Sequence, residues 1–95
     1  MYGSVSRWRV KDGKQDELRL LMEEVTRDQP PGSRALYVYQ ADSDPREHWV
    51  VGVWDSREAY TSNSATPEQD SRFQRLRALM ETDPEWHDGE IVASN

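Results

Sequence analysis

The chain has no cysteine and only two histidines among its 95 residues. The absence of cysteine excludes disulfides, thiolate nucleophiles, iron–sulfur clusters and zinc sites built on thiolates. The two histidines, His48 and His87, lie far apart in the sequence, and neither has a second ligand at the spacing of a metal site. We therefore expect a protein without iron, zinc or haem.

Long apolar segments and clusters of basic residues are also missing. No apolar run approaches the roughly 20 residues of a membrane span, and no apolar segment of a signal peptide follows the N-terminus. These absences favour a cytoplasmic protein that does not enter a membrane. The net charge of −6 argues against nucleic-acid binding, because phosphate contacts require clustered Lys and Arg.

The apolar residues that are present recur with the periods of strands and helices. Residues 2–10 alternate between two faces, which predicts a strand that presents Tyr2, Ser4, Ser6, Trp8 and Val10 on one side. Apolar residues at helical spacing then predict an amphipathic helix that ends at about Arg27, before two prolines and a glycine. The apolar stripe of this helix consists of Leu18, Leu21, Met22 and Val25.

The second half of the chain predicts three more strands and two more helices. Residues 35–41 and 48–54 are rich in aromatic and β-branched residues and flank a polar loop, which indicates an antiparallel hairpin. Capping signals at 55–58 and 66–69 predict a short helix that ends near Asn63 and a longer one that stops at Asp83-Pro84. Residues 90–93 predict a last short strand. His48, which begins a strand beside the loop, is expected to be solvated.

This order of elements, βαββαβ, predicts a ferredoxin-like α+β fold as a single domain over residues 1–95. Its four-stranded antiparallel sheet has two faces, and the helices can cover only one of them. Residues 48–54 are apolar on both faces, so the second face should also be buried. A second copy of the chain is the simplest cover, and we expect a homodimer.

One segment, Trp54-Asp55-Ser56-Arg57-Glu58-Ala59-Tyr60, together with the Thr66-Pro67 helix start and the Asp88-Gly89-Glu90-Ile91 tail, resembles the antibiotic biosynthesis monooxygenase family. The resemblance covers nearly the whole chain, including residues 10–14. It implies a dimeric α+β barrel. It also implies that a small aromatic phenol, quinol or polyketide is oxidised with O₂, without metal or flavin, in a cavity between sheet and helices. Related branches of the family degrade haem or have no known reaction.

The resemblance also implies three catalytic residues. Trp54 and Tyr60 match the aromatic pair that lines the site of the polyketide-oxidising members. Asn63 stands where many relatives have a histidine, and a neutral amide is neither a general base nor a good iron ligand. Asn63 also suits a helix C-cap. We expect Trp54 and Tyr60 to line a pocket with Asn63 at its rim.

Three further residues are candidates for substrate binding. Arg72 is one of the arginines near the place where the family has a basic residue, although a solvated helix face is the alternative. Tyr37 shares a strand face with Tyr39 and fits either a site or sheet packing. His87 has carboxylates beside it that would raise its pKa, which makes it a candidate base.

Direct reaction of O₂ with an organic molecule is spin-forbidden, so most oxygenases use a metal or a flavin. Without either, the protein must supply a dry aromatic cavity, a proton acceptor and donors that hold a phenolate. Trp54 and Tyr60 fit the cavity and the donors, whereas the sequence offers no clear acceptor. A non-catalytic dimeric domain that binds a small ligand or assists a pathway partner is therefore the alternative function.

Overall fold

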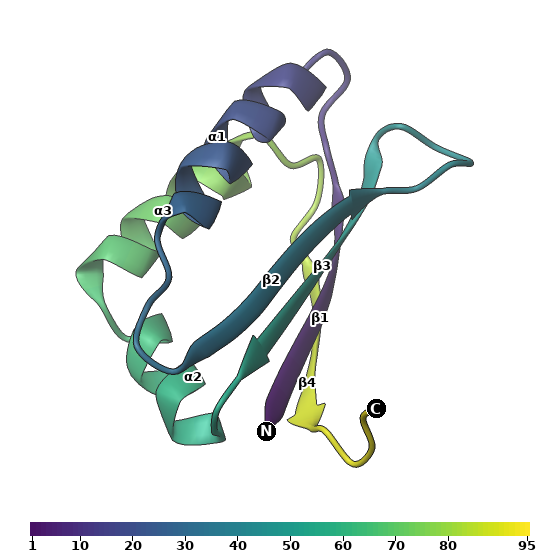
Figure 1. Cartoon of the computed structure of the whole chain (residues 1–95). Helices are drawn as coiled ribbons and strands as arrows, with labels where there is room; N and C mark the ends of the chain where they lie inside the picture. Colours follow the sequence, from purple (N-terminus) through teal and green to yellow (C-terminus); the bar gives the residue numbers. More distant parts are fainter.

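The computed structural model describes residues 1–95 and has the element order β1–α1–β2–β3–α2–α3–β4. All helices lie on one side of a single sheet, as Figure 1 shows. The strands are β1 (Tyr2–Arg9), β2 (Ser33–Gln40), β3 (Glu47–Trp54) and β4 (Glu85–Glu90), and the helices are α1 (Gln15–Arg27), α2 (Arg57–Ser64) and α3 (Pro67–Ala78). The predicted ferredoxin-like α+β fold is confirmed.

The sheet has the strand order β2-β3-β1-β4, and every neighbouring pair is antiparallel. Strand β1 is central, so Tyr2 lies opposite Trp54 of β3 on one side and Glu90 of β4 on the other. The alternation predicted for β1 is confirmed, because Ser4, Ser6 and Trp8 are buried beneath the helices.

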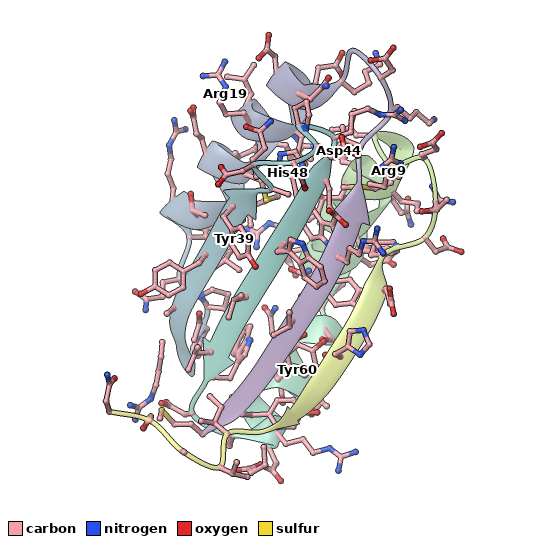
Figure 2. All side chains as sticks on the ribbon, turned by 90° about the vertical axis from the view of Figure 1, so that its right-hand side faces the viewer. Arg9, Arg19, Tyr39, Asp44, His48 and Tyr60 are labelled. Atoms are coloured by element: carbon pink, nitrogen blue, oxygen red, sulfur yellow. The ribbon has the colours of Figure 1, made fainter.

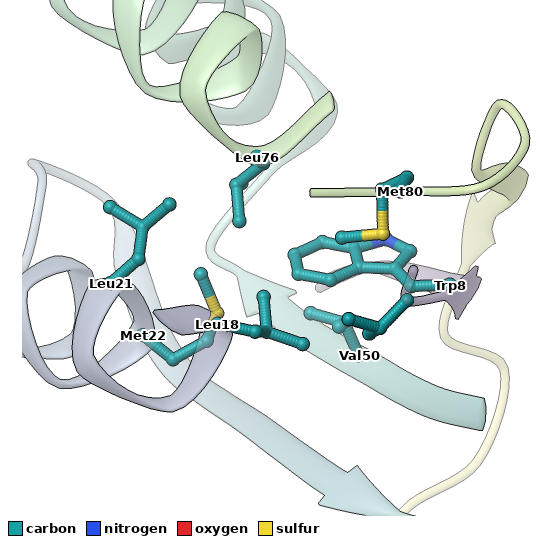
Figure 3. Close-up of a cluster of buried hydrophobic side chains, with 8 residues drawn as sticks. Trp8, Leu18, Leu21, Met22, Val50, Leu76 and Met80 are labelled. Carbon is teal, nitrogen blue, oxygen red and sulfur yellow. The ribbon is translucent and has the colours of Figure 1, made fainter. Parts of the chain in front are cut away.

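The hydrophobic core fills the space between the helices and one end of the sheet (Figure 3). Helix α1 contributes the predicted stripe, and further side chains come from β1 and its end, from β3, and from α3 and the segment after it. The cluster consists of Trp8, Val10, Leu18, Leu21, Met22, Val50, Leu76 and Met80. The core cluster does not extend to the other end of the sheet, where β3 ends.

Two predicted boundaries near the C-terminus are wrong. Helix α3 ends at Ala78 rather than before Pro84, because Met80 forms a bridge with Val10 and extends the pairing at the end of β1. The last strand spans Glu85–Glu90 rather than residues 90–93. Every residue of this edge strand is exposed, so the strand lacks the apolar alternation by which a strand is recognised in a sequence.

The expectation that His48 is solvated is also wrong. His48 is only 8% exposed, because it shares the inward face of β3 with Val50 and Trp54. Its Nδ1 has no hydrogen-bond partner. Burial lowers the pKa of the imidazole, which is therefore held in the neutral form at neutral pH.

The face of the sheet opposite the helices is uncovered in the single chain (Figure 2). Tyr37 and Tyr39 of β2 are 64% and 53% exposed on it. Trp49 and Val51 of β3 are paired with these tyrosines and are half-buried. No other part of the chain packs against this apolar outer face.

None of the helices combines the length and the apolar character needed to cross a membrane.

Candidate active site

A cavity of about 400 Å³ opens between the inner face of the sheet and the helices. Aromatic side chains from β1, β3, α2, α3 and β4 form much of its wall, and these are Trp8, Trp54, Tyr60, Phe73 and Trp86. Its volume lies within the usual range for small-molecule sites, and its aromatic wall is interspersed with polar side chains. The cavity is therefore the candidate site.

The floor of the cavity is built from small residues. Ser4 of β1 lies opposite Gly52 of β3, and both line the cavity with Ser6 and Ala35. A Cβ atom at Gly52 would lie 3.3 Å from Nε1 of Trp54, so glycine keeps the indole close to the sheet. Small residues beneath aromatic walls leave a space whose shape suits a flat ring.

The end of β3 and the start of α2 bring Trp54 and Tyr60 together. Trp54 is the last residue of β3, and Ser56 caps α2 by accepting a hydrogen bond from the Ala59 N–H at 3.1 Å. Tyr60 follows one turn later and points back at the indole. The two rings have centroids 5.8 Å apart and an interplanar angle of 68°, an edge-to-face pair that fixes both side chains.

The turn before β2 holds this strand-to-helix connection in place. Gly32 has a φ of +84°, and a Cβ atom there would lie 2.5 Å from Cβ of Ala59. The Gly32 carbonyl accepts a hydrogen bond from the Asp55 N–H at 2.8 Å, and Arg34 forms an ion pair with the Asp55 carboxylate. Only glycine permits both this conformation and this close approach of α2.

A carboxylate lies at the polar end of the aromatic group. The Tyr60 hydroxyl donates to Oδ2 of Asp88 at 3.2 Å, and Ser4 Oγ donates to Oδ1 of the same carboxylate at 2.5 Å. The Tyr2 ring lies 5.4 Å from the Tyr60 ring. Burial, and to a smaller extent the charge of Asp88, raises the pKa of Tyr60, so its phenol remains a hydrogen-bond donor at neutral pH.

Four of the six candidate residues from the sequence line the cavity: Trp54, Tyr60, Asn63 and Arg72. Arg72 of α3 pairs with Asp28 at the end of α1, another cavity residue. Asn63 lies within α2, and its carbonyl accepts hydrogen bonds from the Thr66 N–H and hydroxyl. The helix C-cap is Ala65, so the C-cap predicted for Asn63 is wrong. The side-chain amide of Asn63 has no hydrogen bond within the chain.

Tyr37 and His87 do not lie in the cavity. Tyr37 pairs with Val51 and His87 pairs with Val5, and these positions face the opposite side of the sheet. The His87 ring contacts Glu85 on the same side at 3.1 Å. Alternation along β2 and β4 directs both side chains away from the helices, so a role in binding a substrate in this cavity has no support from their positions.

The sequence patterns do not single out Asp88 and Trp86, which the structure brings to the site. Both belong to β4, which the sequence places at residues 90–93 and the structure at Glu85–Glu90. A strand beginning at Glu85 would have put Trp86 and Asp88 on one face and His87 on the other. The spacing of Trp86 and Asp88, two residues apart as on one face of a strand, was the signal in the sequence that could have identified them. The structure brings no three His, Cys, Asp or Glu side chains together in a metal-binding arrangement.

The family model of antibiotic biosynthesis monooxygenases matches residues 1–75 of the chain. A protein from Chloroflexus aurantiacus assigned to antibiotic biosynthesis monooxygenases is 27% identical, with a TM-score of 0.83 over 99% of this chain and 95% of that chain. No curated protein matches the chain.

Two more distant structures share the fold. One, from Deinococcus radiodurans, is also assigned to antibiotic biosynthesis monooxygenases; it is 21% identical, with a TM-score of 0.86 over 100% of this chain and 96% of that chain. The other is a variant of SnoaB, a cofactor-independent oxygenase from Streptomyces nogalater. It is 18% identical, with a TM-score of 0.87 over 98% of this chain and 94% of that chain.

Proposed function

The chain belongs to the antibiotic biosynthesis monooxygenase family, and we propose that it oxidises a small phenol, quinol or polyketide-like aromatic with O₂ without a cofactor. The observation that supports this most directly is the aromatic cavity in which Trp54 and Tyr60 meet edge to face. SnoaB, which shares the fold, is named as a cofactor-independent oxygenase.

The reaction needs no external reductant. One atom of O₂ enters the aromatic substrate and the other leaves as water, while the substrate supplies the electrons and the two hydrogens of that water. The first requirement is loss of a proton from the substrate, because an aromatic anion gives up an electron to O₂ far more readily than the neutral molecule does. The protein has to bind the ring, exclude water and take up that proton.

The cavity residues divide these tasks between them. The Trp54 ring forms a wall for a flat substrate, and its indole N–H is a donor for a phenolate oxygen. The Tyr60 phenol stays protonated and directs its hydrogen at Asp88, so its hydroxyl oxygen is a second polar contact for a substrate hydroxyl. Asn63 and Arg72 supply polar groups at the cavity wall, where they would orient the rest of the substrate.

We also propose that the protein works as a homodimer. The outer face of the sheet presents Tyr37, Tyr39, Trp49 and Val51, and no segment of the chain covers it. A 95-residue domain buries a smaller share of its surface on folding than a larger domain does, so covering this apolar face would add substantially to its stability. A two-fold contact places the same residues of both copies against each other.

Oxygen uptake by the purified protein with a panel of quinols, anthrones and polyphenols tests this function. Trp54→Phe and Tyr60→Phe should each reduce the rate about 10–1000-fold, because each removes one hydrogen-bonding group from the site. Tyr37→Phe removes the same hydroxyl group from the opposite face of the sheet and should leave the rate unchanged. Binding of these compounds without any oxygen uptake would instead identify a ligand-binding domain.

A further inference from the structure

We propose that Asp88 is the proton acceptor of this cavity and that it acts through the Tyr60 phenol. As a bound phenol or quinol gives its proton to Tyr60 Oη, Tyr60 gives its own proton to Oδ2 of Asp88. Asp88 does not touch the substrate itself. It acts on the substrate through Tyr60, and in that sense it is a positioning residue. The proposal rests on the proposed function and identifies the base that Asn63 cannot provide.

Two donors fix the carboxylate in the required place. Tyr60 Oη is 3.2 Å from Oδ2, and Ser4 Oγ is 2.5 Å from Oδ1. A phenol whose hydrogen is engaged with a carboxylate keeps its oxygen lone pairs available to accept from a substrate hydroxyl. The geometry therefore matches a two-step proton transfer in which no group has to move first.

The two members of the pair also lie at suitable depths. Tyr60 is half-buried and lines the cavity, whereas Asp88 is exposed on the edge strand β4. A proton that reaches Asp88 can therefore pass directly to solvent. In Figure 2, which looks at the uncovered face of the sheet, Tyr60 is labelled in the lower part of the sheet, beside the edge strand β4.

The two carboxylates that line the cavity itself are less suitable. Asp28 is engaged by the guanidinium of Arg72, and Asp70 accepts from Gln74 Nε2 at 2.9 Å. Neither has a hydrogen bond to an aromatic hydroxyl of the cavity. Asp88 is the carboxylate that is joined to Tyr60.

The charged and titratable groups around Asp88 come from three elements. Tyr60 approaches from α2 and Tyr2 from β1, and Glu90 follows on the same face of β4. Glu90 pairs with the N-terminal amino group of Met1 at 3.5 Å. No Lys or Arg side chain forms an ion pair with Asp88, whose side-chain hydrogen-bond partners are Tyr60 and Ser4.

Chemical rescue tests the proposal. Asp88→Ala should lower kcat about 100–10,000-fold, the usual contribution of a general base, with a much smaller change in KM. Because the site is exposed, added formate should restore part of the rate, and only at a pH where formate is ionised. Asp88→Glu should retain part of the activity, and Glu85→Gln, on the other face of the same strand, should behave as wild type.

A second measurement does not depend on turnover. In protein carrying ¹³C-labelled tyrosine, Asp88→Asn should lower the pKa of Tyr60, because the carboxylate charge raises it in the wild type. If the wild type is active and Asp88→Ala turns over as fast as Glu85→Gln, the proton relay is overturned while the proposed function stands. A slow Asp88→Ala variant that formate does not rescue, with the Tyr60 titration unchanged in Asp88→Asn, would overturn it as well. A wild type that consumes no oxygen would instead defeat the proposed function itself.

Discussion

At the scale of single residues, His48 gives the protein a specific sensitivity to acid. Burial lowers the pKa of its imidazole below the value of 6.5 expected in the unfolded chain. The folded state therefore binds a proton less readily than the unfolded state, and stability should fall as the pH drops below about 6.5 until it reaches the lowered pKa. Urea unfolding at pH 7.5 and at pH 5 measures this loss.

Substitutions separate the contribution of His48 to this pH dependence from that of the carboxylates, whose protonation also lowers stability as the pH falls. His48→Gln should reduce the difference in stability between the two pH values, whatever its effect at pH 7.5. The same two measurements on His87→Asn, at an exposed position of the edge strand, serve as the comparison. An unchanged pH dependence in His48→Gln would mean that the imidazole is protonated as easily in the fold as outside it.

The site residues that the sequence identifies are those held by local structure. Trp54, Tyr60 and Asn63 are joined by one strand end and one capped helix, so their proximity follows from short-range spacing. Asp88 reaches Tyr60 only through the pairing of β4 with β1, which no local pattern encodes. The proton acceptor was therefore absent from the sequence-based site.

At the scale of elements, the turn at Gly32 controls where α2 sits. Gly32→Ala should destabilise the protein by more than the roughly 1–2 kcal/mol of a left-handed backbone, because the new Cβ also meets Ala59. Displacement of α2 should separate Tyr60 from Trp54 and reduce oxygen uptake as well. Chemical denaturation and the oxygen assay measure the two effects.

Gly13→Ala is the matched control for this turn. Gly13 has a φ of +79°, yet a Cβ atom there would meet nothing within 4 Å. It should therefore show only the backbone cost and keep full activity. Equal losses of stability in both variants, with activity intact in both, would show that the contact between Gly32 and α2 does not position the site.

Element boundaries were predictable wherever apolar periodicity or capping chemistry marked them. Ser56 and Thr66 accept the capping hydrogen bonds that their positions predict, with Pro67 at the start of α3. The end of α3 was not predictable, because Leu79 and Met80 continue the helical apolar spacing. Pairing of Met80 with Val10 overrides that spacing, and such long-range backbone contacts have no signature in a local window.

At the scale of the whole molecule, the uncovered sheet face leads to the dimer prediction. Sedimentation at micromolar concentration should give a mass of two 11.1 kDa chains. Tyr39→Glu places a charge on the apolar outer face and should shift the protein towards monomers. Leu20→Glu changes an exposed apolar residue on α1 and should not. A wild-type protein that sediments as one chain would contradict the assembly.

We propose that the aromatic cavity itself carries out monooxygenation with O₂. Turnover of a quinol or anthrone under ¹⁸O₂, with chelator-treated and flavin-free protein, tests this directly by mass spectrometry of the product. We expect one ¹⁸O atom in each product molecule and the second in water, with both signals strongly reduced in Tyr60→Phe. Product without label, or label that appears equally with Tyr60→Phe, would contradict it.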